Sequence, residues 1–403
     1  MKYEYKISNF LLFFSLLLLT LTSHTIYASA FGLLLLIGFM VFEKIPLTIK
    51  AVRESSVFFI LLTVSVCRFI FLADNVLPLY INAFWGNLSL YLFSILLWFV
   101  FRCIIDSSKS NGVYKMITPI LWVHVSAFYI QFFVYLLTNH FIDFLEPFTG
   151  EASRYTFYDN NISLLGTFRP TGLHVEPSTY FFVILILSSI LVLLKREQNN
   201  KKLMFLTILS MFLSFSTAAI IIGSIFTIYL LYNSKLKLKT YLFIFSSLIV
   251  IFLFFSPIII SLYKTQTSKF ETTSIHRFAL IDAILERDLS NAILADGAFA
   301  IEKKIALQNN SLFSDKLTIV TNNDSGVLIY LWLQFGYLGI MYYIILCIWA
   351  YKSGKINLVL FLIVTLSKVK VFSSIFIIFY CIIIFVNYNK MRLNIQGTKS
   401  TQS

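Results

Sequence analysis

The chain has 403 residues, of which 58% are hydrophobic and 13% are charged, against about 25% charged residues in an average soluble domain. This composition excludes a soluble globular domain and predicts an integral membrane protein. The net charge of +13 does not indicate a nucleic-acid partner, because the basic residues lie in short segments between apolar runs, as the positive-inside rule expects.

Most of the sequence consists of apolar runs of about 17 to 25 residues, the length at which a helix crosses about 30 Å of hydrocarbon. The runs lack the period-two alternation of a membrane β-barrel. We therefore expect an all-α polytopic membrane protein with about 12 transmembrane helices. The expected spans are residues 8–24, 25–42, 56–73, 80–101, 116–138, 178–194, 203–216, 217–232, 240–263, 326–351, 356–367 and 371–388.

Short basic segments between these spans predict the orientation of the chain. If every such segment is cytoplasmic, the other loops alternate to the outside and both termini lie inside. This pattern requires residues 203–232 to form a hairpin of two short helices that turns near Ser214, Ser216 and Thr217. Lys368 and Lys370 are exceptions, because this orientation places them outside.

The start of the chain also resembles a signal peptide that ends at Ala28-Ser29-Ala30. Cleavage there would leave residues 31–42 as the next apolar run, which is too short to cross a membrane comfortably. We therefore expect the segment to remain as a span.

Two long polar segments interrupt the apolar pattern, and the charge alternation places both outside, as large periplasmic loops. They hold 13 of the 19 acidic residues. Within the second loop, Ile275 to Leu289 is amphipathic, which predicts a helix lying on the membrane-facing core. The expected organisation is helices 1–5 in residues 1–138, the first loop in 139–177, helices 6–9 in 178–263, the second loop in 264–325, helices 10–12 in 326–390 and a cytoplasmic tail in 391–403.

The most informative motif, Arg169-Pro-Thr-Gly-Leu-His-Val-Glu-Pro-Ser178, lies where the first loop enters the next span. It brings a cation, an imidazole and a carboxylate to the expected depth of the lipid headgroups. Pro177 suits the first turn of a helix, and Glu176 would lie at the positive end of its dipole. Gly172 permits a turn that folds Arg169 back toward Glu176. The alternative interpretation is a capped helix entry with solvated charges.

This motif, R-x-x-G-x-x-x-E-P late in a large outer loop, resembles bacterial O-antigen and capsular polysaccharide polymerases of the Wzy type and the related O-antigen ligases. Asn322 to Gly339 is similar to the helix entry that follows the family's other long loop, although Asn322, Asn323 and Asp324 stand where relatives often have a histidine. The resemblance covers residues 100 to 345. It implies a GT-C-like membrane fold and favours a polymerase over a ligase.

The activity that the resemblance implies is transfer of a growing glycan from undecaprenyl pyrophosphate to a hydroxyl of the next lipid-linked repeat unit. The leaving pyrophosphate needs fixed positive charge, which arginine supplies through paired donors. Arg169 and Arg277 are our candidates, with Arg68 as a third. Arg68 lies inside an expected span, where a cation is either functional or snorkels to the surface.

The attacking hydroxyl needs a proton acceptor, and Glu176 or His174 is the expected general base. His276 and Asp324 are further candidates for substrate binding. The long loops contain no D-x-D pair and no His/Cys cluster, so we expect a metal-independent glycosyltransferase without a cofactor. Its partners would be the undecaprenyl-pyrophosphate-linked oligosaccharide, membrane lipid and, in some systems, a chain-length regulator.

Two other functions fit the same span pattern. A ligase that transfers finished glycan to a lipid core differs only in its acceptor. A lipid-linked oligosaccharide flippase would show internal repeats and charged residues within its spans, and the sequence has little of either. The expected location is the bacterial inner (cytoplasmic) membrane.

Overall fold

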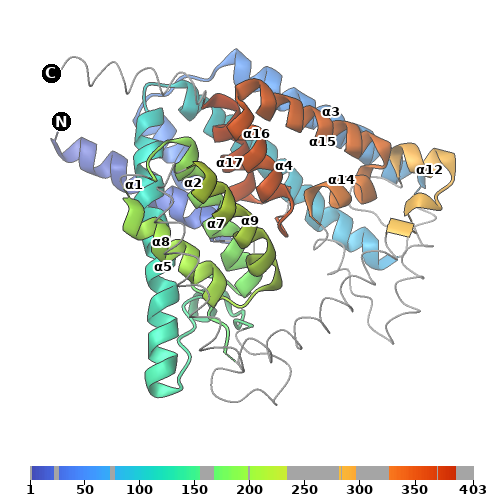
Figure 1. Cartoon of the computed structure of the whole chain (residues 1–403). Helices are drawn as coiled ribbons and strands as arrows, with labels where there is room; N and C mark the ends of the chain where they lie inside the picture. The colour runs from blue at the N-terminus through green and yellow to red at the C-terminus, as the bar shows by residue number, and fades with distance from the viewer. Residues whose placement is uncertain are drawn as a thin grey trace.

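A computed structural model of the chain describes residues 2–21, 27–72, 78–154, 168–197, 200–233, 281–282, 284–295, 326–369 and 371–386. The described residues form helices and contain no β-strand (Figure 1). The predicted all-α class is therefore confirmed for this part of the chain. The expected span 240–263 and most of the amphipathic stretch 275–289 lie outside the described residues.

The helices of the N-terminal half are α1 (Lys2–Thr20), α2 (Tyr27–Phe42), α3 (Ile49–Leu72), α4 (Pro78–Asp106), α5 (Ser110–Thr138) and the short α6 (Glu146–Thr149). Those that follow are α7 (Pro177–Leu193), α8 (Lys201–Leu213), α9 (Thr217–Asn233), α12 (Leu289–Leu294), α14 (Val327–Phe335), α15 (Tyr337–Ser353), α16 (Lys355–Thr365) and α17 (Ser374–Phe385).

Helix α7 forms the centre of the bundle. It packs against α5, α9, α16 and α17, and its side chains are buried on all sides. A helix that is apolar all round must be enclosed by other helices or by lipid. Its N-terminal end, where the Arg169 to Ser178 motif lies, is therefore held firmly by the whole bundle.

The expected hairpin in residues 203–232 is confirmed. Helix α8 ends at Leu213, α9 begins at Thr217, and the two helices pack together. Phe215 lies in the turn with a φ of +48°, a left-handed conformation that cannot continue a right-handed helix. The small polar residues around it therefore mark a real reversal of the chain.

The expected single span 326–351 was wrong, because the chain breaks there into α14 and α15. The break is at Gly336, which has a φ of +61°. A Cβ atom at this position would collide with the carbonyl oxygen of Ala292. Glycine therefore permits both the left-handed turn and the close packing of α12 against this bend.

The C-terminal hairpin is shorter than the expected spans 356–367 and 371–388. Helices α16 and α17 have 11 and 12 residues, so they rise about 16 and 18 Å, well short of about 30 Å of hydrocarbon. The turn between them is enclosed in the bundle, where the Phe372 carbonyl accepts a hydrogen bond from Ser94 of α4 at 2.8 Å. Lys368 lies in this turn and is partly buried, whereas Lys370 lies outside the described residues.

Several basic segments meet at one end of the bundle. Lys109 pairs with Glu43, and Arg102 pairs with Glu54 at 2.7 Å and with Asp106. The guanidinium of Arg102 also lies 3.4 Å from the centre of the Phe385 ring, at the end of α17. The C-terminal ends of α2, α4 and α17 therefore lie at one end of the bundle.

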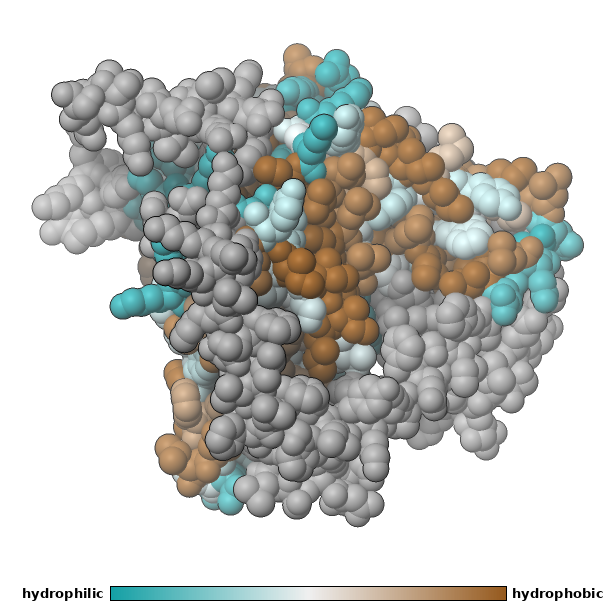
Figure 2. All heavy atoms as spheres, in the orientation of Figure 1, coloured by the Kyte–Doolittle hydropathy of each residue, from teal (hydrophilic) through white to brown (hydrophobic). Residues whose placement is uncertain are grey.

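In the part of the chain that the structure describes, two helical segments, Leu88–Asp106 and Ser110–Thr138, are long and apolar enough to cross a membrane. Seven further apolar helices in this part have 10 to 17 residues. Figure 2 shows hydrophobic side chains spread widely over the visible described surface, and Phe10, Phe31, Leu34, Val41 and Ile228 are among those exposed. Soluble monomers rarely expose apolar patches on this scale.

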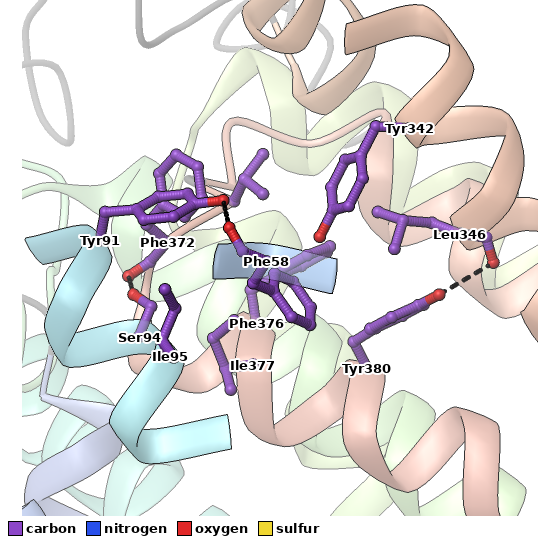
Figure 3. A pocket seen from close by; sticks show the side chains of 11 residues that line it. Phe58, Tyr91, Ser94, Ile95, Tyr342, Leu346, Phe372, Phe376, Ile377 and Tyr380 are labelled. Carbon is purple, nitrogen blue, oxygen red and sulfur yellow. Dashed lines mark hydrogen bonds between the residues drawn. The ribbon is translucent and has the colours of Figure 1, made fainter. Parts of the chain in front are cut away.

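A small cavity of about 10 Å³ lies between α3, α4, α15 and α17. Figure 3 shows the hydroxyl of Tyr342 directed toward the middle of this aromatic group, whereas the hydroxyl of Tyr380 turns to the Leu346 carbonyl, 3.2 Å away. Within the described part of the chain, the buried Tyr342 hydroxyl has no hydrogen-bond partner. A buried hydroxyl without a partner costs about 1–3 kcal/mol.

Tyr342→Phe is therefore expected to raise the melting temperature of the purified protein in detergent, because it removes this cost. The matched variant Tyr380→Phe should lower it, because the Leu346 carbonyl loses its side-chain donor. Thermal unfolding of the two variants beside the parent protein measures both effects. A lower melting temperature for Tyr342→Phe would show that its hydroxyl has a partner.

Candidate functional site

The first long loop is fixed to the C-terminal half of α5 by the side chain of Gln131. Its Oε1 accepts hydrogen bonds from the backbone N–H groups of Thr171 and Gly172, at 3.1 and 2.7 Å. Its Nε2 donates to the carbonyls of Ile142 and Gly172, both at 2.9 Å. A buried amide can satisfy about four hydrogen bonds, so Gln131 is fully used in holding both ends of the loop.

Gly172 makes the turn that the motif requires. Its φ of +60° is left-handed, as expected from the sequence. A Cβ atom here would lie 2.9 Å from the ring of Tyr180 on α7, so the turn also packs directly against the central helix. The hydroxyl of Tyr180 in turn donates to Ser210 of α8 at 2.8 Å.

Asp143 organises the beginning of the loop. Its Oδ1 accepts the N–H groups of Leu145 and Glu146 at 2.9 and 3.0 Å, and its Oδ2 accepts that of Ser153 at 2.7 Å. Burial works to raise the pKa of this carboxyl, but these hydrogen bonds outweigh it and lower the pKa below its usual value. A lowered pKa means that the contribution to stability is complete at neutral pH and is lost only in strong acid.

Glu176 lies at the start of α7, directly before Pro177. Its side chain does not cap the helix. It forms an ion pair with Nη1 of Arg154 and accepts a hydrogen bond from the Ser178 hydroxyl at 3.1 Å. The Glu176 side chain is 28% exposed and that of Arg154 is 49% exposed. The pair is therefore open to solvent on one side and supported by the helix on the other.

Arg154 is the cation that the sequence analysis missed. Its backbone N–H donates to the Val175 carbonyl at 2.7 Å, so its main chain lies directly beside that of the motif. The sequence could have indicated Arg154 by its residue type, since Arg154 and Arg169 are the two arginines of the first loop. Distance along the sequence favoured Arg169, which is seven residues from Glu176, over Arg154, which is 22 residues away.

Arg169 occupies a more enclosed position next to an aromatic group. It is partly buried, and its Nε atom is enclosed by protein. The preceding Phe168 stacks on Tyr135 of α5, with ring centres 3.8 Å apart, and contacts the ring of Phe141. The structure therefore holds the main chain beside Arg169 on the C-terminal half of α5.

His174 points into the bundle. It is fully buried, and its ring stacks on His124 of α5 at 5.1 Å. Its Nε2 lies 3.3 Å from Nδ1 of His124, whose Nε2 is 2.7 Å from the Thr20 hydroxyl of α1. A base must reach the proton that it removes. This location therefore suits a positioning role, in which His174 ties the motif to α5 and, through His124, to α1.

Arg68 reaches a helix end instead of the outer surface. Its Nε donates to the Ala295 carbonyl, just after α12, at 3.1 Å. Arg287 similarly donates to the carbonyls of Trp332 and Leu333 at the end of α14. Unpaired carbonyls at helix C-termini favour cations, so these arginines fasten part of the second loop to the bundle.

The other candidates from the second loop, His276, Arg277 and Asp324, lie outside the described residues, as do Asn322 and Asn323. Among the residues that the structure describes, no three His, Cys, Asp or Glu side chains gather as metal ligands would. The small cavity lined by Tyr342 is formed by other segments and includes no residue of the first loop.

Comparison with known proteins assigns no family. No family model, curated protein or solved structure matches the chain. The functional argument therefore rests on the geometry of the first loop and on the motif that it carries.

The geometry offers two chemical capacities beside each other. The guanidinium of Arg154 can bind an anion through paired donors, and the carboxylate of Glu176 can accept a proton. Both groups have solvent access and lie at the entrance to an apolar helix. The arrangement suits a substrate that combines a charged group with a hydroxyl.

Gln131→Leu is expected to release the first loop from α5, because it leaves buried backbone groups of Ile142, Thr171 and Gly172 without partners. The protein should lose about 2 kcal/mol or more of stability and become more sensitive to trypsin at Arg154, which is followed by Tyr155. Thermal unfolding and timed proteolysis in detergent measure both effects. Ser126→Ala, an exposed change on the same helix, is the control, and equal cleavage of the two variants would contradict the clamp.

Proposed function

We propose that the chain is a multi-pass inner-membrane polysaccharide polymerase, which transfers a growing glycan from undecaprenyl pyrophosphate to the next lipid-linked repeat unit. The observation that carries this proposal is the Glu176–Arg154 pair at the entrance to α7. It provides a proton acceptor and an anion ligand within contact distance. The widely exposed apolar surface supports a lipid environment.

The proposed orientation places the basic end of the bundle in the cytoplasm and the first loop outside, with both termini inside. The ion pairs that join the segments after α2 and α4 support this, because positively charged loops favour the cytoplasmic side. Glu176 and Arg154 then lie at the outer boundary of the membrane. A polyprenyl chain could remain in lipid there while its pyrophosphate meets the two side chains.

In the proposed reaction, the hydroxyl oxygen of the acceptor sugar bonds to the anomeric carbon of the donor glycan. The bond from that carbon to the pyrophosphate oxygen breaks, and undecaprenyl pyrophosphate leaves with the electron pair. The carboxylate of Glu176 accepts the hydroxyl proton. Arg154 and Arg169 stabilise the negative charge that develops on the leaving group.

His174 contributes indirectly in this scheme. Its buried contact with His124 fixes the chain two residues before Glu176. A general base must lie within hydrogen-bond distance of its target, so a rigid support for Glu176 matters. Arg68 instead fixes the end of α12, in the second loop, through its bond to Ala295.

The activity is tested through the surface glycan of a deletion strain. A missing polymerase should leave a single repeat unit on the core, whereas complete loss of glycan would indicate a ligase or a flippase. Complementation with Glu176→Gln, Arg154→Gln or Arg169→Ala should fail to restore polymer at a normal protein level. Lys201→Gln, an exposed lysine of α8, should restore it. Near-normal glycan ladders from all three site variants would overturn the assignment.

The orientation is tested with reporter fusions. A periplasm-specific reporter should be active after Gly150 in the first loop and inactive after Ser353 at the end of α15. The alternation of basic and acidic segments gives this expectation. A cytoplasmic signal from the Gly150 fusion would place the Glu176–Arg154 pair on the wrong side for the proposed substrate.

A further inference from the structure

Arg154 and Glu176 form an ion pair with each other in the structure. The proposed reaction, however, needs both groups free for the substrate. The guanidinium contacts the carboxylate through Nη1. While the two groups are paired, Oε1 of Glu176 is blocked from an incoming hydroxyl, and the engaged guanidinium has fewer donors for phosphate. The two side chains must separate before the chemistry can proceed.

Separating the two side chains costs little free energy. Both side chains are partly exposed, and solvent-exposed ion pairs contribute little net stability. The backbone of Arg154 is meanwhile fixed by its bond to Val175, and its neighbour Ser153 is held by Asp143. The long arginine side chain can therefore swing while its Cα atom stays beside the site.

Glu176 keeps its place when the arginine leaves. The Ser178 hydroxyl still donates to its Oε2, and the positive end of the 17-residue helix α7 still favours a negative charge. The carboxylate would thus remain oriented and open to an incoming hydroxyl. When the donor is present, two anions, the carboxylate of Glu176 and the pyrophosphate, can compete for the guanidinium of Arg154.

We propose that the pyrophosphate of the donor displaces Glu176 from Arg154, so that binding of the donor itself frees the general base. Pyrophosphate carries more negative charge than a carboxylate and can accept paired hydrogen bonds from a guanidinium. Before the donor binds, Glu176 is engaged with Arg154 and does not act as a base. This inference rests on the proposed function. It adds an order of steps to the reaction, in which the donor binds before the acceptor is deprotonated.

The exchange predicts opposite effects of the two partners on pyrophosphate affinity. Glu176→Gln should bind farnesyl pyrophosphate, a short analogue of the donor lipid, about two- to fivefold more tightly, because the competing carboxylate is gone. Arg154→Gln should bind it about tenfold more weakly, because a charge-assisted contact is lost. Binding is measured on purified protein in detergent, with farnesol as the uncharged control ligand.

The double variant separates exchange from simple charge repulsion. If Glu176 acts by competing for Arg154, then Glu176→Gln should have no effect on affinity in the Arg154→Gln background. General repulsion would instead give the same gain in both backgrounds, since distant charge effects add. An additive cycle would therefore overturn the exchange. Lys201→Gln, which removes one positive charge from α8, should leave affinity close to that of the parent protein.

The outcomes also distinguish failure of the exchange from failure of the proposed function. If the parent protein binds farnesyl pyrophosphate no better than farnesol, the proposed function fails. If it binds specifically but Glu176→Gln is not tighter, the exchange alone fails. Melting temperatures of all variants establish that each is folded, and Glu176→Gln keeps the shape of the side chain.

Discussion

The buried amide of Gln131 is the contact on which the candidate site depends. It satisfies backbone groups from both ends of the first loop, at Ile142 and at Thr171 and Gly172. Polar backbone cannot remain unpaired in a dry interior without a large cost. A loop that must cover the end of an apolar bundle therefore needs such a partner, and one side chain of α5 supplies it.

The position of Glu176 follows from that clamp. Gly172 turns against Tyr180, His174 stacks on His124, and α7 then begins at Pro177. These contacts come from α5 and α7, so the carboxylate is placed by the packing of the bundle. Arg154 enters the site through a backbone bond to Val175. The main chain of both residues is therefore fixed at the entrance to α7, whereas their paired side chains have solvent access.

Short and broken helices shape the other half of the molecule. Helices α16 and α17 are too short to cross a bilayer separately, and α14 turns into α15 at Gly336. Non-helical backbone at membrane depth is tolerated when protein encloses it. The buried turn between α16 and α17 meets this condition through Ser94 and through Ser374, which donates to the Leu19 carbonyl. Arg68 and Arg287 likewise donate hydrogen bonds to carbonyls at the ends of α12 and α14.

The sequence by itself determined the helical class, the reversal near Phe215, the turn at Gly172 and the start of α7 at Pro177. Each of these depends on local properties, namely the length of an apolar run, the conformational freedom of glycine or the fixed φ of proline. It did not determine the break at Gly336, because the apolar pattern continues through it and the packing of α12 decides it.

The tertiary structure alone decided which groups meet at the site. Glu176 pairs with Arg154 and not with Arg169, which is nearer in the sequence. His174 stacks on a histidine 50 residues away, and Arg68 donates to a carbonyl 227 residues away. Ion pairs and hydrogen bonds depend on distances of a few ångströms in space. Sequence spacing fixes such distances within one helix, but between helices only the packing of the bundle fixes them.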